Sequence, residues 1–487
     1  MTLSLDDVGL LRTQAYIDGQ WTDAEDGSTR PVHNPATGEI IARVANCGAH
    51  ETERAIAAAA AAMPAWRARP IKERAALLRA WFERMLQAQE DLAQLLTTEQ
   101  GKPLAEARGE IAYGASYIEW FAEEAKRLYG DVIPAPGADK RLLMIRQPVG
   151  VVACITPWNF PNAMLTRKIA PALAAGCTVV CKPANATPLS AYAFVELATR
   201  AGIPPGVINV VTGRTDQIGS TLTASPIVRK LTFTGSTPVG KQLTQACAGT
   251  MKRTSMELGG NAPFIVFDDA DLEAAVEGAL RAKFRNAGQT CVCANRLLVQ
   301  DGVFEAFVDR FAAAAKALRL GNGAEPAVDL GPLIDSRAAS DVMGFIDDAR
   351  EKGATVVTGG ARADLGECFV QPTVLTGVTR EMRGFREEIF GPVAPIMRFR
   401  TEDEAIEIAN DTEFGLAAYF YARDIGRIWR VGEALAFGMV GINEGIISNE
   451  MAPFGGVKES GQGREGSRYG LDDYTEMKYL CMGGIDR

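Results

Sequence analysis

The feature that most constrains the fold is an alternation of short apolar runs and helical segments that begins at residue 149. The candidate strands are Val149–Ile155, Cys177–Cys181, Val207–Val211 and Arg229–Phe233, and helices begin between them near Asn162, Thr187, Thr215 and Pro238. Parallel strands need long crossovers, usually helices, and these helices cover both faces of the sheet. The alternation therefore predicts an α/β fold around a mostly parallel sheet.

Further segments of the same kind follow this first series. Val266 lies in a candidate strand, and the pattern continues with a helix at Leu272–Arg285, a strand at Arg296–Val299, a helix at Val303–Leu318, and strands at Ala354–Val357, Val393–Phe399 and Met439–Asn443. Upstream, helical spacing predicts helices at 55–62, 72–100 and 104–128. At about 150 residues per domain, 487 residues have room for two to four domains.

Two segments do not fit the α/β alternation. The turn sequence PAPGAD (134–139) separates Tyr129–Ile133 from the strand-like Arg141–Gln147, which predicts a β-hairpin. Near the chain end, Asp473–Leu480 alternates like a strand and has no neighbouring partner in the sequence. It either pairs within its own chain or joins a sheet of a neighbouring subunit.

The composition excludes several classes of partner. Fifty-one basic and sixty acidic residues give a net charge of −9, which disfavours nucleic acid and anionic membranes as partners. No apolar run reaches the ~18 residues of a membrane span. The first residues, MTLSLDD, contain no basic segment, so we expect no secretory signal. Nine cysteines form no even disulfide framework, which predicts a reducing cytoplasm.

The chain has only two histidines, His33 and His50, both near its beginning. A Ser-His-Asp or Cys-His hydrolase needs a histidine beside its nucleophile, and zinc enzymes usually take histidines in pairs. We therefore expect no metal site. If the protein is an enzyme, its proton chemistry depends on carboxylates, lysines or cysteines.

Cysteine is the nucleophile that least needs an imidazole partner, because a few per cent of it is thiolate at pH 7. Cys291 lies in the short segment NAGQTCVCAN (286–295), between a predicted helix and a predicted strand. Loops of this kind present functional side chains. The alternative is that Cys291 is a small buried hydrophobe.

Two further residues could take part in catalysis. Asn159, in TPWNFP (156–161), follows an apolar strand, where α/β proteins place ligands, and its amide could donate to an oxyanion. The alternative is a helix cap. Glu257, in MELGG, could act as a general base if burial raises its pKa. The alternative is an exposed carboxylate at a strand end.

Two other strand ends could contact a nucleotide. They are the segment KPAN (182–185) and the segment FTGST (233–237), which opens a helix whose N-terminus could face a phosphate. The usual GxGxxG fingerprint is absent, and neither segment alone establishes a dinucleotide site.

Together these segments form a recognisable series. The motifs are PWNFP (157–161), KPA (182–184), FTGS (233–236), ELGG (257–260), GQTC (288–291), EEIFGP (387–392) and PFGGVKESG (453–461). In order and spacing, the chain resembles the aldehyde dehydrogenase superfamily over nearly its whole length. The resemblance implies a Rossmann-like cofactor domain, an α/β catalytic domain and a small β oligomerisation element.

The resemblance also implies a mechanism. The Cys291 thiolate attacks the aldehyde to give a thiohemiacetal, whose oxyanion is held by the Asn159 amide and the Cys291 N–H. Hydride transfer leaves a thioester, which water activated by Glu257 hydrolyses. The charge of Lys168 favours the thiolate; the alternative is a solvated helix residue.

The implied cofactor is NADP or NAD. By resemblance, its contacts are Thr156, Pro157, Trp158, Lys182, Ala184, Asn185, Gly235, Ser236, Leu258, Glu388 and Phe390. Members that prefer NAD often carry a glutamate where this chain has Asn185. The neutral side chain beside Lys182 predicts that NADP is accepted and preferred.

The substrate group with the strongest resemblance is the succinate-semialdehyde dehydrogenases. The matching stretches include KFRNAGQTCVCANR and NEGIISNEMAPFGG. In that group two arginines and a serine bind the distal carboxylate, and they fall here on Arg167, Arg285 and Ser448. The alternative for each arginine is a surface salt bridge. Glutarate semialdehyde is the alternative substrate, because it is only one methylene longer and a methylene changes specificity by only ~1–3 kcal/mol.

The alternative classes are a non-catalytic binding protein on the same fold and an esterase that uses the same thiol.

The resemblance has two further implications. Cys293 could close a regulatory disulfide with Cys291, which would be short, strained and reducible. The alternative is that Cys293 is a passive buried thiol. The expected modules are a cofactor domain (1–129 and 149–256), a catalytic domain (257–465) and an oligomerisation element (130–148 and 466–487). The last module implies a homodimer or homotetramer.

Overall fold

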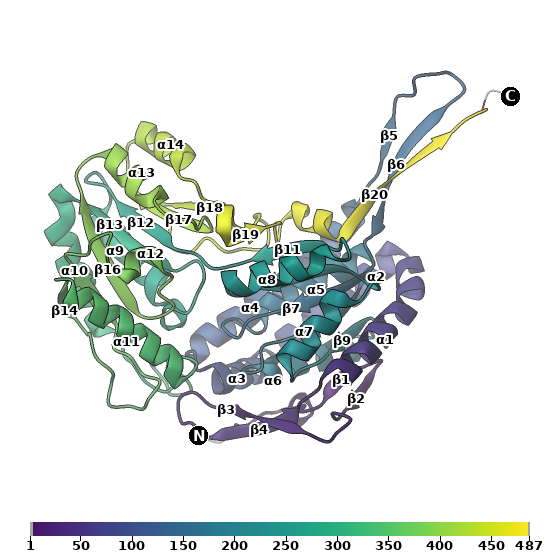
Figure 1. The fold of residues 1–487 in the computed structure, drawn as a ribbon, viewed down its shortest axis with the longest axis horizontal. Coiled ribbons are helices and arrows are strands. Elements are labelled where there is room, and N and C mark those ends of the chain that lie inside the picture. Colours follow the sequence, from purple (N-terminus) through teal and green to yellow (C-terminus); the bar gives the residue numbers. More distant parts are fainter. Residues whose placement is uncertain (1–2, 486–487) are drawn as a thin grey trace.

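The computed structural model describes residues 3–485. Two large sheets and a small projecting sheet organise the chain (Figure 1). Helices pack against both large sheets, so the α/β fold expected from the alternation is confirmed.

The first sheet has eight strands in the order β19-β11-β10-β7-β8-β9-β1-β2. They are β1 (Ala15–Ile17), β2 (Gln20–Thr22), β7 (Val151–Ile155), β8 (Thr178–Lys182), β9 (Ile208–Val210), β10 (Val228–Thr234), β11 (Arg253–Glu257) and β19 (Gly461–Gln462). The five central strands β7 to β11 run parallel. At the edges, β1 pairs antiparallel with β9, β2 pairs antiparallel with β1, and β19 pairs antiparallel with β11. The four strands predicted after residue 149 are all present, with ends shifted by one or two residues.

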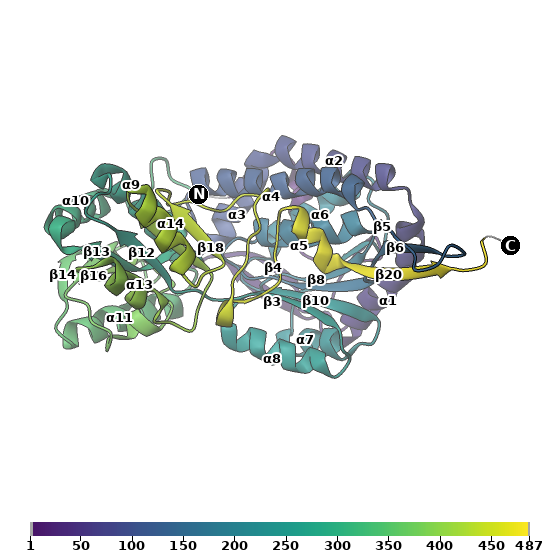
Figure 2. The same ribbon diagram turned by 90° about the horizontal axis from the view of Figure 1, so that it is seen from above.

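Helices cover both faces of this sheet (Figure 2). They are α1 (Ala49–Ala68), α2 (Ile71–Gln87), α3 (Gln89–Gln100), α4 (Leu104–Glu124), α5 (Ala163–Ala175), α6 (Pro188–Arg200), α7 (Thr215–Ala224) and α8 (Thr237–Ala248). The helices α2 to α6 lie on one face, and α7 and α8 lie on the other. The stretch predicted as helical over 72–100 is divided at Ala88 into α2 and α3.

The order of the central strands has a functional consequence. From β7 the chain moves outward through β8 and β9, then returns to place β10 and β11 on the other side of β7. In doubly wound sheets a ligand crevice forms at such a switch point, outside the carboxyl ends of the strands. Here that point lies between β7 and β10, which are followed by Thr156 and by Gly235.

The second sheet has the order β14-β15-β16-β13-β12-β17-β18. Its strands are β12 (Ala262–Val266), β13 (Ala294–Gln300), β14 (Thr355–Thr358), β15 (Thr373–Thr376), β16 (Val393–Phe399), β17 (Ala417–Tyr421) and β18 (Met439–Ile442). Only β14 is antiparallel within the described sheet. The helices that accompany it are α9 (Leu272–Phe284), α10 (Phe304–Ala317), α11 (Ser336–Glu351), α12 (Arg383–Arg386), α13 (Glu402–Asn410) and α14 (Ile425–Ala434).

Residues 258–261 connect the two large sheets directly. They join the end of β11 to the start of β12. This short connection brings loops at the carboxyl edge of the first sheet close to loops at the amino edge of the second. Separate apolar cores lie on the two faces of each sheet.

The third sheet contains β5 (Asp131–Ile133), β6 (Arg141–Pro148) and β20 (Thr475–Met482) and projects from the body (Figure 1). The predicted hairpin is confirmed. The terminal strand β20 pairs antiparallel with β6 over eight residues, so it finds its partner within its own chain. The strands β3 (Thr29–His33) and β4 (Ile40–Ala45) form a separate hairpin.

Short 3-10 helices complete the structure. They are η1 (Val8–Leu10), η2 (Ala125–Arg127), η3 (Arg285–Gly288), η4 (Asp301–Val303), η5 (Lys458–Ser460) and η6 (Arg468–Tyr474). Across residues 3–485, no helix is both long enough and apolar enough to cross a membrane. The domain boundaries stay a prediction; the strand β19, placed by sequence in the catalytic part, pairs with β11 of the first sheet.

Candidate active site

A pocket of about 310 Å³ lies where the two sheet edges meet. The site residues predicted from sequence that line it are Pro157, Trp158, Asn159, Arg167, Gly235, Ser236, Leu258, Arg285, Cys291, Glu388, Phe390 and Ser448. The predicted residues that lie outside its lining are Thr156, Lys168, Lys182, Ala184, Asn185, Glu257 and Cys293. Six of the seven motifs, although spread over some 300 residues, therefore contribute to one pocket, and only KPA (182–184) lies outside its lining.

The side chain of Asn159 is fixed between two loops. Its Nδ2 donates to the carbonyl oxygen of Gln289 at 3.0 Å, and its Oδ1 accepts from the Phe160 N–H at 3.1 Å. The amide is thus held against the Cys291 loop. Because Nδ2 carries two hydrogens and one is used here, the second can serve an acceptor in the pocket.

The loop that carries Cys291 begins with an unusual backbone. Asn286, Ala287 and Gly288 have φ of 53°, 54° and 75°, three consecutive residues in the left-handed region. A Cβ on Gly288 would lie 2.1 Å from the carbonyl oxygen of Gly391. Gly288 of GQTC is therefore needed because the two backbones touch, whereas a Cβ on Gly391 of EEIFGP would lie 2.3 Å from Cγ2 of Val342.

The thiol of Cys291 is protonated near neutral pH. Burial raises the pKa of Cys291 to about 12, and the charge of Glu388 adds to this effect, while Arg167 opposes it. Lys168 does not lie in the pocket lining; its ammonium is hydrogen-bonded to Glu465 and, at 2.6 Å, to Thr234 Oγ1. The predicted influence of Lys168 on the thiolate stays a prediction.

Glu257 is the last residue of β11 and is only 3% exposed. Within residues 3–485, neither of its carboxyl oxygens finds a hydrogen-bond partner. Burial and the nearby charge of Glu465 raise the pKa of Glu257 well above its usual value. The alternative of an exposed strand-end carboxylate is therefore wrong.

Glu465 was not predicted from sequence, although it organises two of the predicted residues. Arg167 Nε lies 2.7 Å from Glu465 Oε2, and Lys168 pairs with the other oxygen. Burial alone would raise the pKa of Glu465, but the two cations outweigh it and hold the pKa below its usual value. Arg167 thus forms a buried ion pair, not the surface salt bridge considered as its alternative.

The pocket still offers donors for an anion. Among the described residues Arg285 has no ion-pair partner, and its guanidinium lies over the Phe160 ring at 4.9 Å. Nη2 of Arg167 is also buried, and it finds no hydrogen-bond partner among residues 3–485. Tyr113, a lining residue that sequence reasoning missed, adds a hydroxyl 3.0 Å from that of Tyr117.

Another part of the lining suits a nucleotide. Gly235 and Ser236 lie at the N-terminus of α8, and a Cβ on Gly235 would lie 2.3 Å from the Phe233 ring. Trp158 and Phe390 pack edge to face at 5.6 Å and present aromatic walls. Free N–H groups at a helix start bind phosphate, so the residues present fit a dinucleotide.

Two charged residues flank this region. Glu388 Oε1 accepts the Gly260 N–H at 3.0 Å, and burial raises the pKa of Glu388 to about 7. Burial also lowers the pKa of Lys182 to about 8, with a smaller contribution from Arg30. Both groups therefore titrate close to neutral pH.

Asn185 is already engaged by protein groups. Its Nδ2 donates to the Gly213 carbonyl at 2.8 Å and to Thr215 Oγ1 at 3.1 Å. These bonds tie the loop after β8 to the loop after β9. The nearby Thr156 N–H donates to the Lys182 carbonyl, and the Ala184 carbonyl accepts from Thr187. The cofactor contacts of these residues stay predictions.

Cys293 is buried outside the main pocket. Its Sγ donates to the Lys283 carbonyl at 3.5 Å, and it lines a small separate cavity with Tyr419. All nine cysteines, each within the described residues, carry free thiols. A disulfide between Cys291 and Cys293 stays a prediction.

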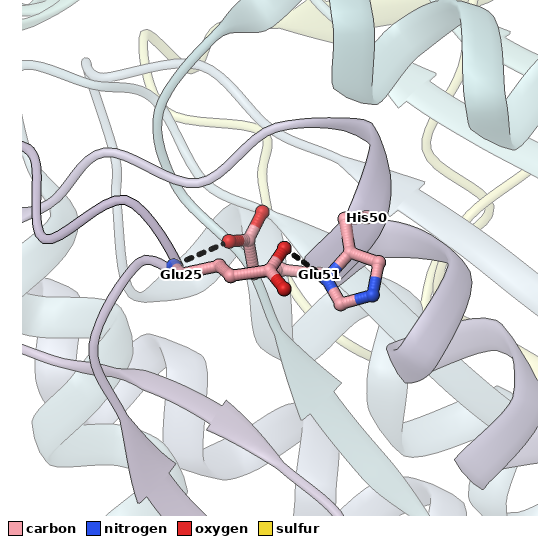
Figure 3. Close-up of side chains that lie close together, drawn as sticks. All are labelled: Glu25, His50 and Glu51. Carbon is pink, nitrogen blue, oxygen red and sulfur yellow. Dashed lines mark hydrogen bonds and ion pairs between the residues drawn. The ribbon is translucent and has the colours of Figure 1, made fainter.

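The two histidines lie outside the pocket lining. His50 Nδ1 is 2.7 Å from Glu25 Oε2, next to Glu51 (Figure 3). The carboxylate oxygens of Glu51 accept the N–H groups of Glu25 and Gly48 at 2.8 and 2.7 Å. This cluster is explained by capping at the start of α1. His33 contacts the Gly38 carbonyl.

Comparisons with known proteins agree with this geometry. A glutarate-semialdehyde dehydrogenase of Pseudomonas aeruginosa is 62% identical over 483 residues, 99% of this chain and 100% of the relative. A 3-sulfolactaldehyde dehydrogenase of Pseudomonas putida is 62% identical over 485 residues, covering 100% of both chains. A succinate-semialdehyde dehydrogenase of Escherichia coli (strain K12), named for NADP(+), is 60% identical over 481 residues, 99% of this chain and 100% of the relative.

Solved structures have the same fold as this chain. The crystal structure of an NADP-dependent enzyme of E. coli superposes with a TM-score of 0.98 at 60% identity, over 99% of this chain and 100% of that chain. The model of the aldehyde dehydrogenase family matches residues 21–480. With a family match over nearly the whole length and a pocket lined by six of the seven motifs, the chain belongs to the aldehyde dehydrogenase family.

Proposed function

We propose that the protein oxidises an aldehyde that carries a terminal carboxylate to the corresponding acid, with NADP or NAD as the hydride acceptor. Succinate semialdehyde is the first candidate substrate and glutarate semialdehyde the alternative. One observation carries the proposal: a single pocket holds the Cys291 thiol, the Asn159 amide and the Arg285 guanidinium, which has no ion-pair partner within residues 3–485.

In this mechanism Cys291 loses its proton and attacks the aldehyde carbon. The second N–H of the Asn159 amide and the Cys291 N–H stabilise the resulting oxyanion. A bound nicotinamide supplies the hydride acceptor, and the thiohemiacetal becomes a thioester. Glu257, once ionised, takes a proton from water, which hydrolyses the thioester and regenerates the thiol. No step needs a histidine.

The cofactor would be held by residues from both sheets. Gly235 and Ser236 would offer the start of α8 to the pyrophosphate, Lys182 and Glu388 would bind the ribose hydroxyls, and Trp158 and Phe390 would flank the nicotinamide. NADP is proposed as the preferred cofactor because the neutral Asn185 presents no charge that repels a 2′-phosphate. The relative in E. coli is likewise named for NADP(+).

The aldehyde tail would be bound by Arg285, Arg167 and Ser448, with Tyr113 beside them. A guanidinium suits a carboxylate because its fork of N–H groups matches the two oxygens. Since Glu465 already engages Arg167 Nε, Arg285 supplies most of the unpaired charge.

A sulfonate tail is a second candidate. A relative 62% identical over 485 residues is named a 3-sulfolactaldehyde dehydrogenase. A sulfonate is also an anion, and the same donors would accept its oxygens. Including a sulfonated aldehyde in the assay separates the two tails.

We also propose a homodimer or homotetramer in a reducing cytoplasm. The projecting sheet exposes Val132, Met477 and Tyr479, which supports its use in assembly. The free thiols support a reducing compartment.

The test is a panel of kcat/KM values for succinate, glutarate and sulfonated semialdehydes and for butanal, with both cofactors, read at 340 nm. Replacing Arg285 with Gln is expected to raise KM for the anionic aldehydes by tenfold or more, about the value of a charged hydrogen bond, and to spare butanal. Arg281→Gln, an exposed change outside the pocket, is the matched control.

Equal losses of kcat/KM on charged and neutral aldehydes would contradict recognition of the tail by Arg285. An absorbance change that persists in Cys291→Ala would contradict the mechanism. No cofactor reduction with any aldehyde would favour the non-catalytic alternative.

A further inference from the structure

The N-terminal part of α4 lies against both sides of the pocket. Lys102 precedes the helix, and Glu106 and Glu110 lie four residues apart on it, so they share one face. This face contacts the Asn159 turn, which follows β7 of the first sheet, and the Asn286 turn, which precedes β13 of the second sheet. Neither Glu106 nor Glu110 lines the main pocket.

Lys102 and Glu110 hold the Asn159 side. Lys102 Nζ donates to Glu110 Oε2 at 2.6 Å and to the Asn159 carbonyl at 2.8 Å, and both charged side chains are at most 1% exposed. Glu110 Oε1 accepts the N–H groups of Asn162 and Ala163 at 2.9 and 3.2 Å, at the start of α5. These hydrogen bonds engage the carbonyl of Asn159 and the first N–H groups of α5, so they hold the Asn159 turn in place.

Glu106 holds the other side. Its Oε2 accepts the N–H of Asn286 at 2.9 Å. Asn286 begins the left-handed turn that leads to Cys291, and its Nδ2 donates to the Asn159 carbonyl at 3.0 Å and to the Gln289 carbonyl at 3.2 Å. Ala287, the second residue of that turn, has a Cβ, so its φ of 54° is strained.

Strained residues persist only where the surrounding structure determines them. The carboxylate of Glu106 is such a determinant, because it fixes the first N–H of the turn. The Asn159 amide comes from one sheet and the Cys291 thiol from the other, so their separation depends on groups that bridge the two.

We propose that Glu106 and the Lys102–Glu110 pair are positioning residues that set the Asn159 amide against the Cys291 thiol. This inference rests on the proposed function, in which these two groups act on the aldehyde. They act through the turns and touch neither substrate nor cofactor.

The main test compares two replacements of Glu106. Glu106→Leu removes the acceptor for the Asn286 N–H and is expected to lower kcat by about tenfold to 100-fold, the effect of misplacing reacting groups by about 1 Å. The loss should be the same for succinate semialdehyde and butanal. Glu106→Gln keeps an acceptor oxygen and should retain most of kcat.

A rescue distinguishes positioning from loss of folding. Ala287→Gly removes the strain of the left-handed turn, so in the Glu106→Leu background it should restore part of kcat. Glu119→Leu on the same helix is the matched control, because it breaks an ion pair with Arg79 whose side chains are 41% and 40% exposed and should leave kcat unchanged. Full kcat in Glu106→Leu would overturn the proposal.

A loss confined to KM for the charged aldehyde would also overturn it, because Glu106 would then act through the neighbouring Arg285. If Glu106→Leu does not fold, Glu110→Gln is the second variant, and it should lower kcat with both aldehydes; unchanged kcat there would equally refute the proposal. Failure of the proposed function is distinguishable, since the wild-type protein would then reduce no cofactor with any aldehyde.

Discussion

At the residue scale, burial acts on both groups that the proposed mechanism uses in ionised form. The pKa of Cys291 is raised to about 12, and that of Glu257 is raised well above its usual value. Arg167 is the cation that opposes the rise at Cys291, and it lies in the same pocket.

The raised pKa of Cys291 predicts how its alkylation depends on pH. Only the thiolate reacts, and the thiolate fraction of a group with pKa about 12 grows about tenfold per pH unit below that value. The rate of inactivation of the cofactor-free protein by iodoacetamide should therefore rise without a plateau from pH 6 to pH 10. A plateau beginning near pH 8 would contradict the burial effect. Because Cys291→Ala has no activity to lose, its alkylation is followed by mass spectrometry and gives the contribution of the other thiols.

The site residues that sequence could predict are those whose motifs follow or precede a strand. Asn159, Glu257 and Cys291 fall in this group. Glu465, Tyr113 and Glu106 could not be found, because their roles arise from contacts across large sequence separations. Glu465, for example, meets Lys168 at a distance of 297 residues along the chain, and no local pattern marks such a pair.

At the scale of elements, the alternation after residue 149 predicted most of the strands, but it missed β15, β17 and β19 and did not give the order in which the strands pair. Apolar periodicity says which face of a segment is buried, and it does not say on which side of β7 a later strand will pair. The switch point between β7 and β10 came only from the structure. The short strands β1 to β4 were also missed, because three to six residues carry too little periodicity to predict.

The buried ion pair that joins α4 to the Asn159 turn predicts a stability change. Lys102→Met leaves the Glu110 carboxylate buried beside no cation, and breaking a buried pair by one partner costs about 3–5 kcal/mol. Urea unfolding should report this loss in the free energy of unfolding.

The matched comparison is the double variant Lys102→Met with Glu110→Leu. Removing both charges should cost less than the sum of the two single changes, because no unpaired charge remains. Additive losses would mean that the pair is not coupled.

At the scale of the whole molecule, the projecting sheet leaves large apolar side chains exposed to solvent. Met477 and Tyr479 lie on one face of β20, because they are two residues apart, and they are 71% and 60% exposed. Val132 of β5 is 79% exposed on the same sheet. Since β20 already pairs with β6, assembly would bury these side chains and the outer strand edges.

This exposure predicts that charge on the projecting sheet disrupts assembly. Met477→Lys with Tyr479→Lys would put two like charges into a contact that must be dry, so the assembly should shift to smaller species with the fold intact. Light scattering after size-exclusion chromatography measures the mass, and circular dichroism checks the fold. Met251→Lys, at a residue 88% exposed after α8, is the control and should leave the mass unchanged. An unchanged mass in the double variant, or a monomeric wild-type protein, would remove the projecting sheet as the assembly surface.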